Sequence, residues 1–282
     1  MKKSLFLLSF LFFCLSAESQ NLPKGKLFII GGGKRPPEML DRMLKEAQLT
    51  SEDYIVILPL ASEEPDSAVF YAKKQFANYP YQVVGMNFSK ENSKDFSTAR
   101  LDSIRKAKLI YCTGGDQNKF MGIVKDTELE KALREAYQIG ALIAGTSAGA
   151  AMMSEKMITG NEKKYSEYSE TFQTIEANNI EIAQGMAFLK GVIIDQHFLI
   201  RSRHNRLFSA ILEYPDHIGI GIDEATAILV TANTAEVVGN AQVILFRAQK
   251  AKIRRTTKDL WAATGIQIDI LVQGDTFSLK KP

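Results

Sequence analysis

Ser147 lies in a stretch whose residue types and spacing suit nucleophilic catalysis. Gly145, Ser147 and Gly149 have the Gly-x-Ser-x-Gly spacing of a nucleophile elbow, which holds a serine on a tight turn between a strand and a helix. Such a turn needs neighbours without bulk, and Gly145, Ala148 and Gly149 provide them. A glycine-rich turn with an incidental serine is the alternative. The apolar strand before the turn and the apolar helix start after it favour a nucleophile.

A serine nucleophile needs a base to take its proton, and histidine is the usual base near neutral pH. The chain contains three histidines: His197, His204 and His217. His197 follows a buried strand, whereas His204 lies among arginines on an expected helix and His217 begins an expected strand. We therefore predict that His197 is the base. The alternative is a hydrogen-bonded histidine of the core.

A third group, a carboxylate, must fix the tautomer of the histidine, and the residues alone leave its identity open. The candidates are Glu162, Glu167, Glu170, Asp195, Asp223 and Glu224. For the oxyanion hole we expect the backbone N–H groups of Gly115 and Ala148. Glycine at position 115 would allow the main chain to approach a substrate.

Three arginines, Arg201, Arg203 and Arg206, follow the histidine closely. Arginine side chains form paired hydrogen bonds with carboxylates, and Asp195 is close enough in sequence to meet a guanidinium group or to brace the arginines. The segment therefore suits a ligand that carries both carboxylate and guanidinium groups. A solvated basic helix, or an internal network of ion pairs, is the alternative.

The elements that position these residues alternate between strands and helices. Strands are predicted at residues 26–30, 54–61, 81–88, 108–112 and 141–145, with helices at 36–49, 67–78, 97–107 and 127–139 between them. This alternation predicts a parallel sheet covered on both faces, with its chemistry at the carboxyl ends of the strands. Residues 31–33, Ser62, residues 114–117 and Ser147 all occupy such ends. The glycine run at 31–33 lacks the pattern of a nucleotide loop, so we interpret it as a turn near the site.

After the elbow the chain changes character. Residues 159–179 are polar and predict a loop or lid, residues 191–194 a strand, and the arginine-containing segment a helix. Residues 217–222, 227–246 and 266–279 predict further strands, and the basic run 252–258 predicts a solvated edge strand. The sequence contains no repeat or linker that would separate a second domain, so residues 20–282 are expected to form a single α/β domain.

Residues 1–19 have the pattern of a secretory signal peptide, with two lysines, an apolar run and small residues before a cleavage site. We expect an exported protein, periplasmic or secreted. Removal of this segment lowers the formal net charge from +3 to +2, which points to neither nucleic acid nor an anionic membrane. No later apolar run would span a bilayer. Cys112 is then the sole remaining cysteine, so no internal disulfide forms.

Taken together, the motifs carry a resemblance to the serine-peptidase family that contains cyanophycinase and aspartyl dipeptidase (peptidase E). The matching segments are residues 113–117, 145–150, 195–207 and 221–227. The Asp195-Gln196-His197-Phe198 block and its three arginines resemble the cyanophycinase branch, and the match extends from the first strand to about Val230.

The resemblance implies a class I glutamine-amidotransferase-like three-layer sandwich with a mostly parallel central sheet. It also implies a Ser147 nucleophile with a His197 base, and an acidic third member after the elbow helix, for which Glu162 is the closest positional match and Glu167 stays open. Residues that would shape the substrate pocket are Gln117, Asp195, Gln196, Arg201, Arg203 and Arg206. In that family the substrate is a polyaspartate backbone with arginine side groups, cleaved into β-Asp-Arg dipeptides.

The expected partner is a peptide substrate with aspartyl residues, and no metal or other cofactor is expected. A homodimer stays open, as does an α-aspartyl or isoaspartyl peptide as the substrate. A glutamine amidotransferase would need a cysteine at the elbow, where this chain has Ser147. A non-catalytic peptide-binding protein is the second rival, and the presence of both Ser147 and His197 argues against it.

Overall fold

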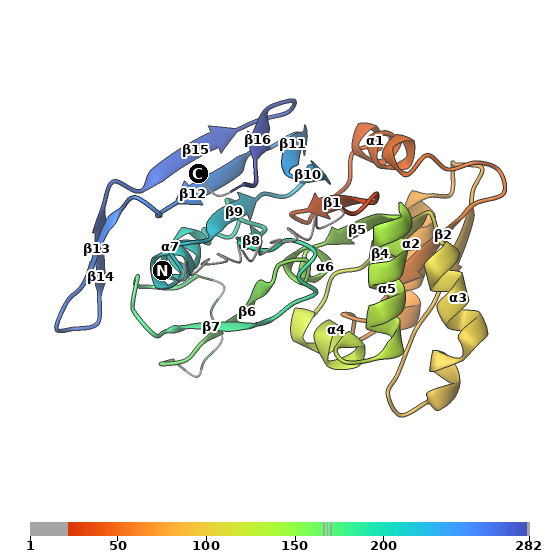
Figure 1. The fold of residues 1–282 in the computed structure, drawn as a ribbon, viewed down its shortest axis with the longest axis horizontal. Helices are drawn as coiled ribbons and strands as arrows, with labels where there is room; N and C mark the ends of the chain where they lie inside the picture. The colour runs from red at the N-terminus through yellow and green to blue at the C-terminus, as the bar shows by residue number, and fades with distance from the viewer. Residues whose placement is uncertain (1–21, 166, 168, 170, 281–282) are drawn as a thin grey trace, which may run out of the picture.

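The computed structural model describes residues 22–280, apart from residues 166, 168 and 170 (Figure 1). The predicted signal peptide, residues 1–19, lies outside this part of the chain. Among the described residues, no helix combines the length and the apolar character that a membrane span requires.

An eight-stranded mixed sheet forms the centre of the molecule (Figure 1). Its parallel part has, in spatial order, β1 (Lys26–Ile30), β5 (Leu142–Thr146), β4 (Leu109–Cys112), β2 (Tyr54–Leu58) and β3 (Gln82–Gly85). Antiparallel strands β10 (Thr226–Thr231), β11 (Thr234–Gly239) and β16 (Thr276–Ser278) extend the sheet beyond β1. The predicted α/β fold with a mostly parallel sheet is confirmed.

Alternate side chains of the parallel strands are buried on opposite faces of this sheet. Phe28 and Ile30 face the core under α1 (Pro37–Ala47) and α2 (Pro65–Gln75). Leu27 and Ile29 face the other core, under α3 (Thr98–Lys106), α4 (Gln117–Val124) and α5 (Glu128–Ile139). A short 3-10 turn, Ser93–Phe96, precedes α3. Both faces are therefore covered, which explains why the strands are apolar throughout.

A second, four-stranded sheet has the order β15 (Gln267–Leu271), β12 (Val243–Arg247), β9 (Ile218–Ile222) and β8 (Val192–Gln196). Its strands β8 and β9 are parallel, and helix α7 (His204–Glu213) packs on it through Leu207 and Ile211, close to Gly219. The turn after β9 carries the chain from this sheet into β10 of the larger one. Residues from both sheets therefore meet at this crossing.

Two antiparallel hairpins complete the fold: β6 (Lys156–Glu162) with β7 (Ile180–Gln184), and β13 (Lys252–Arg255) with β14 (Trp261–Thr264). The prediction of a loop over residues 159–179 is thus wrong at its start, since β6 continues to Glu162. The predicted helix containing the three arginines begins only at His204, so Arg201 and Arg203 lie in the preceding turn. Strand β13 is largely exposed, as expected for the basic run.

Candidate active site

Ser147 occupies the turn between β5 and the short helix α6 (Ala148–Ala151), with φ 54° and ψ −115°. Gly145 and Gly149 must be glycines, because a side chain at either position would clash with the backbone. A Cβ atom on Gly145 would lie 2.1 Å from the carbonyl oxygen of Gly149, and one on Gly149 would lie 2.5 Å from that of Cys112. The predicted strand–turn–helix elbow is confirmed, and its packing accounts for the small residues.

The structure brings Ser147 and His197 together. The Nε2 atom of His197 lies 2.9 Å from the Oγ atom of Ser147, and its Nδ1 atom lies 2.5 Å from Oε1 of Glu224. With the proton on Nδ1, the imidazole donates to the carboxylate and Nε2 accepts from the serine hydroxyl. These three side chains have the arrangement of a nucleophile, a base and an orienting acid.

Glu162 does not have the position expected of the acid. It lies on β6, where its carboxylate accepts a hydrogen bond of 2.6 Å from the side chain of Asn179, and Glu167 is exposed. Glu224 occupies that position instead, because the crossing from β9 to β10 carries its carboxylate to His197. Glu224 belongs to the family-like segment 221–227, and this signal could have identified it.

The environment of His197 lowers its pKa below the ordinary value of 6.5. Burial is the main cause, since the residue is 7% exposed and desolvation disfavours the charged form. The hydrogen bond to Glu224 raises the pKa in opposition, while the charges of Arg201 and Arg203 lower it. His197 is therefore neutral, and able to accept a proton, at neutral pH.

A polar cleft of about 300 Å³ opens beside Ser147. It is lined by Gly115, Asp116, Gln117, Asn118, Ser147, Thr159, Gly160, Asn161, Gln196, Arg201, Arg203 and Arg206. Five of the six predicted pocket residues are among them; Asp195 is not. Gln117 is held in place by hydrogen bonds from its Nε2 atom to the carbonyl oxygens of Ile158 and Thr159, 2.9 and 2.6 Å long.

Asp195 is buried, with 1% of its surface exposed, and both of its carboxylate oxygens accept hydrogen bonds from Arg206. Its predicted contact with substrate is therefore replaced by a bracing role. Arg203 is also buried, and donates to the backbone and side-chain oxygens of Gln196 at 2.6 Å each. Arg201 alone of the three is partly exposed at the cleft. The three arginines thus divide into two that organise the wall and one that faces the opening.

Of the two residues predicted for the oxyanion hole, Ala148 directly follows Ser147, and Gly115 lies in the turn after β4, the strand beside β5. Gly115 lines the cleft with φ 139°, and a Cβ atom there would lie 2.0 Å from the carbonyl oxygen of Ala61. Ala148 is the first residue of α6, so its N–H has no partner within that helix. Their role as donors to an oxyanion stays a prediction. Among the described residues, no group of three or more histidine, cysteine or acidic side chains is arranged to hold a metal ion.

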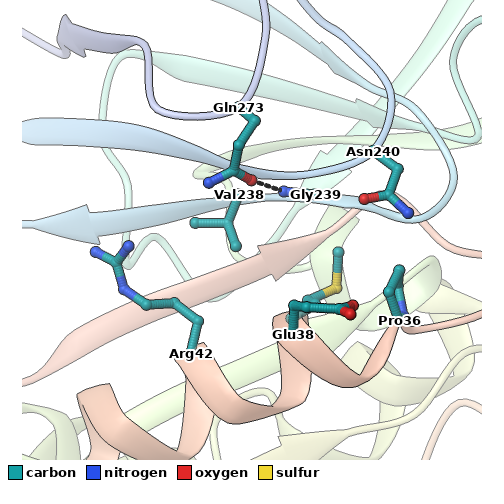
Figure 2. Close-up of a pocket in the computed structure, with 8 residues that line it drawn as sticks. Pro36, Glu38, Arg42, Val238, Gly239, Asn240 and Gln273 are labelled. Atoms are coloured by element: carbon teal, nitrogen blue, oxygen red, sulfur yellow. Dashed lines mark hydrogen bonds between the residues drawn. The ribbon is translucent and has the colours of Figure 1, made fainter.

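A separate cavity of about 520 Å³ lies between α1 and the turn from β11 to β12 (Figure 2). It is lined by Pro36, Glu38, Met39, Arg42, Val238, Gly239, Asn240 and Gln273, so it shares no lining residue with the cleft. The N–H of Asn240 donates to the carbonyl oxygen of Ala225, 2.9 Å away. One lining residue of this cavity, Asn240, is therefore hydrogen-bonded to the turn that carries Glu224.

The sequence model of Peptidase family S51 matches residues 27–238, which include Ser147, His197 and Glu224. The chain belongs to this peptidase family. It is accordingly a serine-type peptidase, a hydrolase.

Individual relatives agree with this assignment. The peptidase is 30% identical over 270 residues to the cyanophycinase of Geminocystis herdmanii, covering 91% of this chain and 94% of that protein. It is 29% identical over 276 residues to the cyanophycinase of Trichormus variabilis, covering 94% and 89%. The crystal structure of a peptidase from an acI-B1 Actinobacterium shares the fold, with a TM-score of 0.65 at 21% identity and coverage of 92% and 98%.

Proposed function

We propose that this peptidase is an exported serine exopeptidase that hydrolyses β-aspartyl peptide bonds, as a cyanophycinase does, and releases β-Asp-Arg dipeptides from a polyaspartate backbone. The observation that carries the proposal is the hydrogen-bonded chain Ser147–His197–Glu224 beside a polar cleft lined by arginines. The relatives named cyanophycinase, matched over more than 90% of this chain, support the substrate class. We further propose that the α/β fold is of the class I glutamine-amidotransferase type.

In the proposed mechanism, Oγ of Ser147 attacks the carbonyl carbon of the scissile bond while Nε2 of His197 takes the hydroxyl proton. Glu224 keeps the imidazole in the correct tautomer and stabilises its positive charge. The N–H groups of Gly115 and Ala148 donate to the oxyanion. His197 then gives the proton to the leaving amine, and an acyl-enzyme remains. Water, deprotonated by His197, hydrolyses this ester and restores the serine.

The cleft supports an aspartyl substrate through its charges. Arg201 faces the opening and suits a substrate carboxylate, whereas Arg206 is neutralised by Asp195. Asp116 supplies an exposed carboxylate on the cleft wall; its Oδ1 atom accepts from the N–H of Asn118 at the start of α4, and its Oδ2 atom suits a guanidinium group. A ligand with both kinds of charge therefore fits the cleft better than an apolar peptide does.

The decisive experiment is mass spectrometry of the products formed by the purified mature protein from cyanophycin, β-aspartyl dipeptides and α-aspartyl dipeptides. We expect β-Asp-Arg from cyanophycin with the parent protein and none with Ser147→Ala. Products from the α-aspartyl peptides alone would identify an aspartyl dipeptidase instead. Binding of every peptide without any cleavage would contradict the enzymatic proposal.

The proposal of export has its own test. The mature protein should begin near residue 20 and form one folded unit. Amino-terminal sequencing of the processed protein would check the first point. Limited proteolysis would check the second, since two domains would be released separately.

A further inference from the structure

We infer that the carboxyl end of β1, residues 30–33, is a positioning element that sets the nucleophile, the base and the acid relative to one another; this inference rests on the proposed function. Three consecutive carbonyl oxygens in this stretch carry the argument. That of Ile30 accepts from the N–H of Ser147 at 3.1 Å, that of Gly31 from the N–H of His197 at 2.8 Å, and that of Gly32 from the N–H of Ala225 at 3.0 Å.

These hydrogen bonds connect three segments that are far apart in the sequence to one short stretch of backbone. Ser147 follows β5, His197 follows β8, and Ala225 is the residue after Glu224 in the crossing to β10. Since each bond fixes the backbone of one catalytic segment, a shift of β1 would move all three segments. The distances between Oγ, the imidazole and the carboxylate therefore depend on residues that carry no reactive group.

The glycines of the same stretch also set how closely the side chains approach. A Cβ atom on Gly32 would lie 2.2 Å from Cε1 and 2.5 Å from Nε2 of His197, so the imidazole rests against the bare Cα. A Cβ atom on Gly33 would lie 2.6 Å from Oε2 of Glu224. Contacts this short cannot form, so a side chain at position 32 must displace the base, and one at position 33 must displace the acid.

Because residues 31–33 do not line the cleft, such a displacement should affect the chemical step more than substrate binding. A misplacement of about 1 Å in a catalytic group lowers the rate by about 10²-fold. Residues 31–33 are thus positioning residues, and the glycine run predicted to lie near the site has a defined task there.

The chain offers matched controls. Gly32 has φ 132° and Gly140 has φ 128°, so Gly32→Ala and Gly140→Ala place a side chain at nearly the same unfavourable φ. At Gly140, however, the nearest atom to a new Cβ is Cβ of Lys24 at 3.9 Å. In the same way Gly33, with φ 68°, is matched by Gly265, with φ 77° and no atom within 4 Å.

For Gly32→Ala we expect kcat to fall about 10²-fold or more, KM to stay within about threefold, and the melting temperature to match that of Gly140→Ala. The rate of Ser147 labelling by a fluorophosphonate should fall with kcat. For Gly33→Ala we expect a smaller loss of kcat and a shift of the pH–kcat/KM profile to lower pH. Of the charged groups that act on His197, Glu224 raises its pKa while Arg201 and Arg203 lower it. Displacing Glu224 therefore lowers the pKa of His197 further.

The inference is overturned if Gly32→Ala and Gly33→Ala keep the kcat and the labelling rate of their controls. If Gly32→Ala fails to fold while Gly140→Ala folds, the comparison of Gly33→Ala with Gly265→Ala decides. An unchanged kcat and pH profile for Gly33→Ala, relative to Gly265→Ala, then overturns the inference. Failure of the proposed function has a different signature, since the parent protein would then release no β-Asp-Arg from cyanophycin, while the fluorophosphonate labelling rates of the variants and their controls would still test the positioning.

Discussion

The two sides of the His197 imidazole are built in different ways. On the Nε2 side, Ser147 belongs to a continuous strand–turn–helix whose residues are almost all buried. On the Nδ1 side, Glu224 comes from the turn between two sheets, and its side chain is 37% exposed. The nucleophile is therefore positioned by local chain geometry, whereas the acid is positioned by the meeting of distant strands. An error in long-range packing should affect the acid first.

The largest effect is expected on the nucleophile side. Ser147→Ala should lower kcat at least about 10³-fold with an unchanged fold, because the base then has no hydroxyl to activate. His197→Ala should be equally damaging and the double variant little worse, since the two groups act as a unit. Steady-state kinetics with circular dichroism would check this. Ser147→Ala with more than a tenth of the parent activity would remove Ser147 from the mechanism.

The acid side should give a smaller effect. Glu224→Gln should lower kcat about 10²-fold, because the amide no longer fixes the tautomer or stabilises the imidazolium, although solvent at this exposed position partly replaces it. Glu162→Gln is the matched control and should stay within about threefold of the parent. A larger loss for Glu162→Gln than for Glu224→Gln would return the acid to its sequence-predicted position.

The arginines of the cleft extend the comparison to buried and exposed positions. Arg201→Lys should reduce kcat/KM about tenfold with a smaller loss of stability than Arg206→Lys, because lysine cannot reproduce the paired hydrogen bonds of the guanidinium group and position 201 is partly exposed. Arg206→Lys should instead destabilise the fold by about 1–3 kcal/mol, since it leaves buried Asp195 without its paired donors. Calorimetry and steady-state kinetics on both variants would separate the two roles. A larger loss of stability in Arg201→Lys than in Arg206→Lys would contradict this assignment.

The pH dependence should show the smallest change. His197 acts as a base in its neutral form, so kcat/KM should rise with pH through the pKa of His197 and level off above it. Since burial lowers that pKa, the rise should lie below pH 6.5. In Glu224→Gln the rise should move to lower pH still, because the hydrogen bond that raises the pKa is lost. A rise centred above pH 6.5 in the parent would contradict this account.

The sequence was sufficient where the signal is local. The elbow at Ser147 follows from spacing and small residues, and the parallel strands follow from apolar runs that alternate with helices. His197 could be chosen because it follows a buried strand. Residue spacing could not rank Glu224 above Glu162, because its approach depends on how the chain crosses from β9 to β10; only its place in the family-like segment 221–227 pointed to it. No local pattern encodes that crossing.

The structure also differs from the sequence prediction at strand β6 and at Asp195, and both differences arise from long-range packing. The end of strand β6, residues 159–162, falls within the predicted loop because residues 159–179 are polar, yet pairing with β7 makes it part of a strand. The resemblance assigns Asp195 to the substrate pocket, and the residues alone leave bracing of the arginines as an alternative. Its ion pair with Arg206 allows it to be buried, and the sequence could not decide between the two roles because burial depends on tertiary packing.

Positive φ angles at Ser147, His197 and Ala225 have a consequence for how the enzyme responds to heat. Each such angle at a residue with a side chain costs about 1–3 kcal/mol, against a folding free energy of about 5–15 kcal/mol. Of the ten non-glycine residues with positive φ in the described part of the chain, these three lie where the β1 carbonyls hold the catalytic segments together. Local opening there releases the strain of three residues at once, so thermal inactivation should precede melting of the sheet.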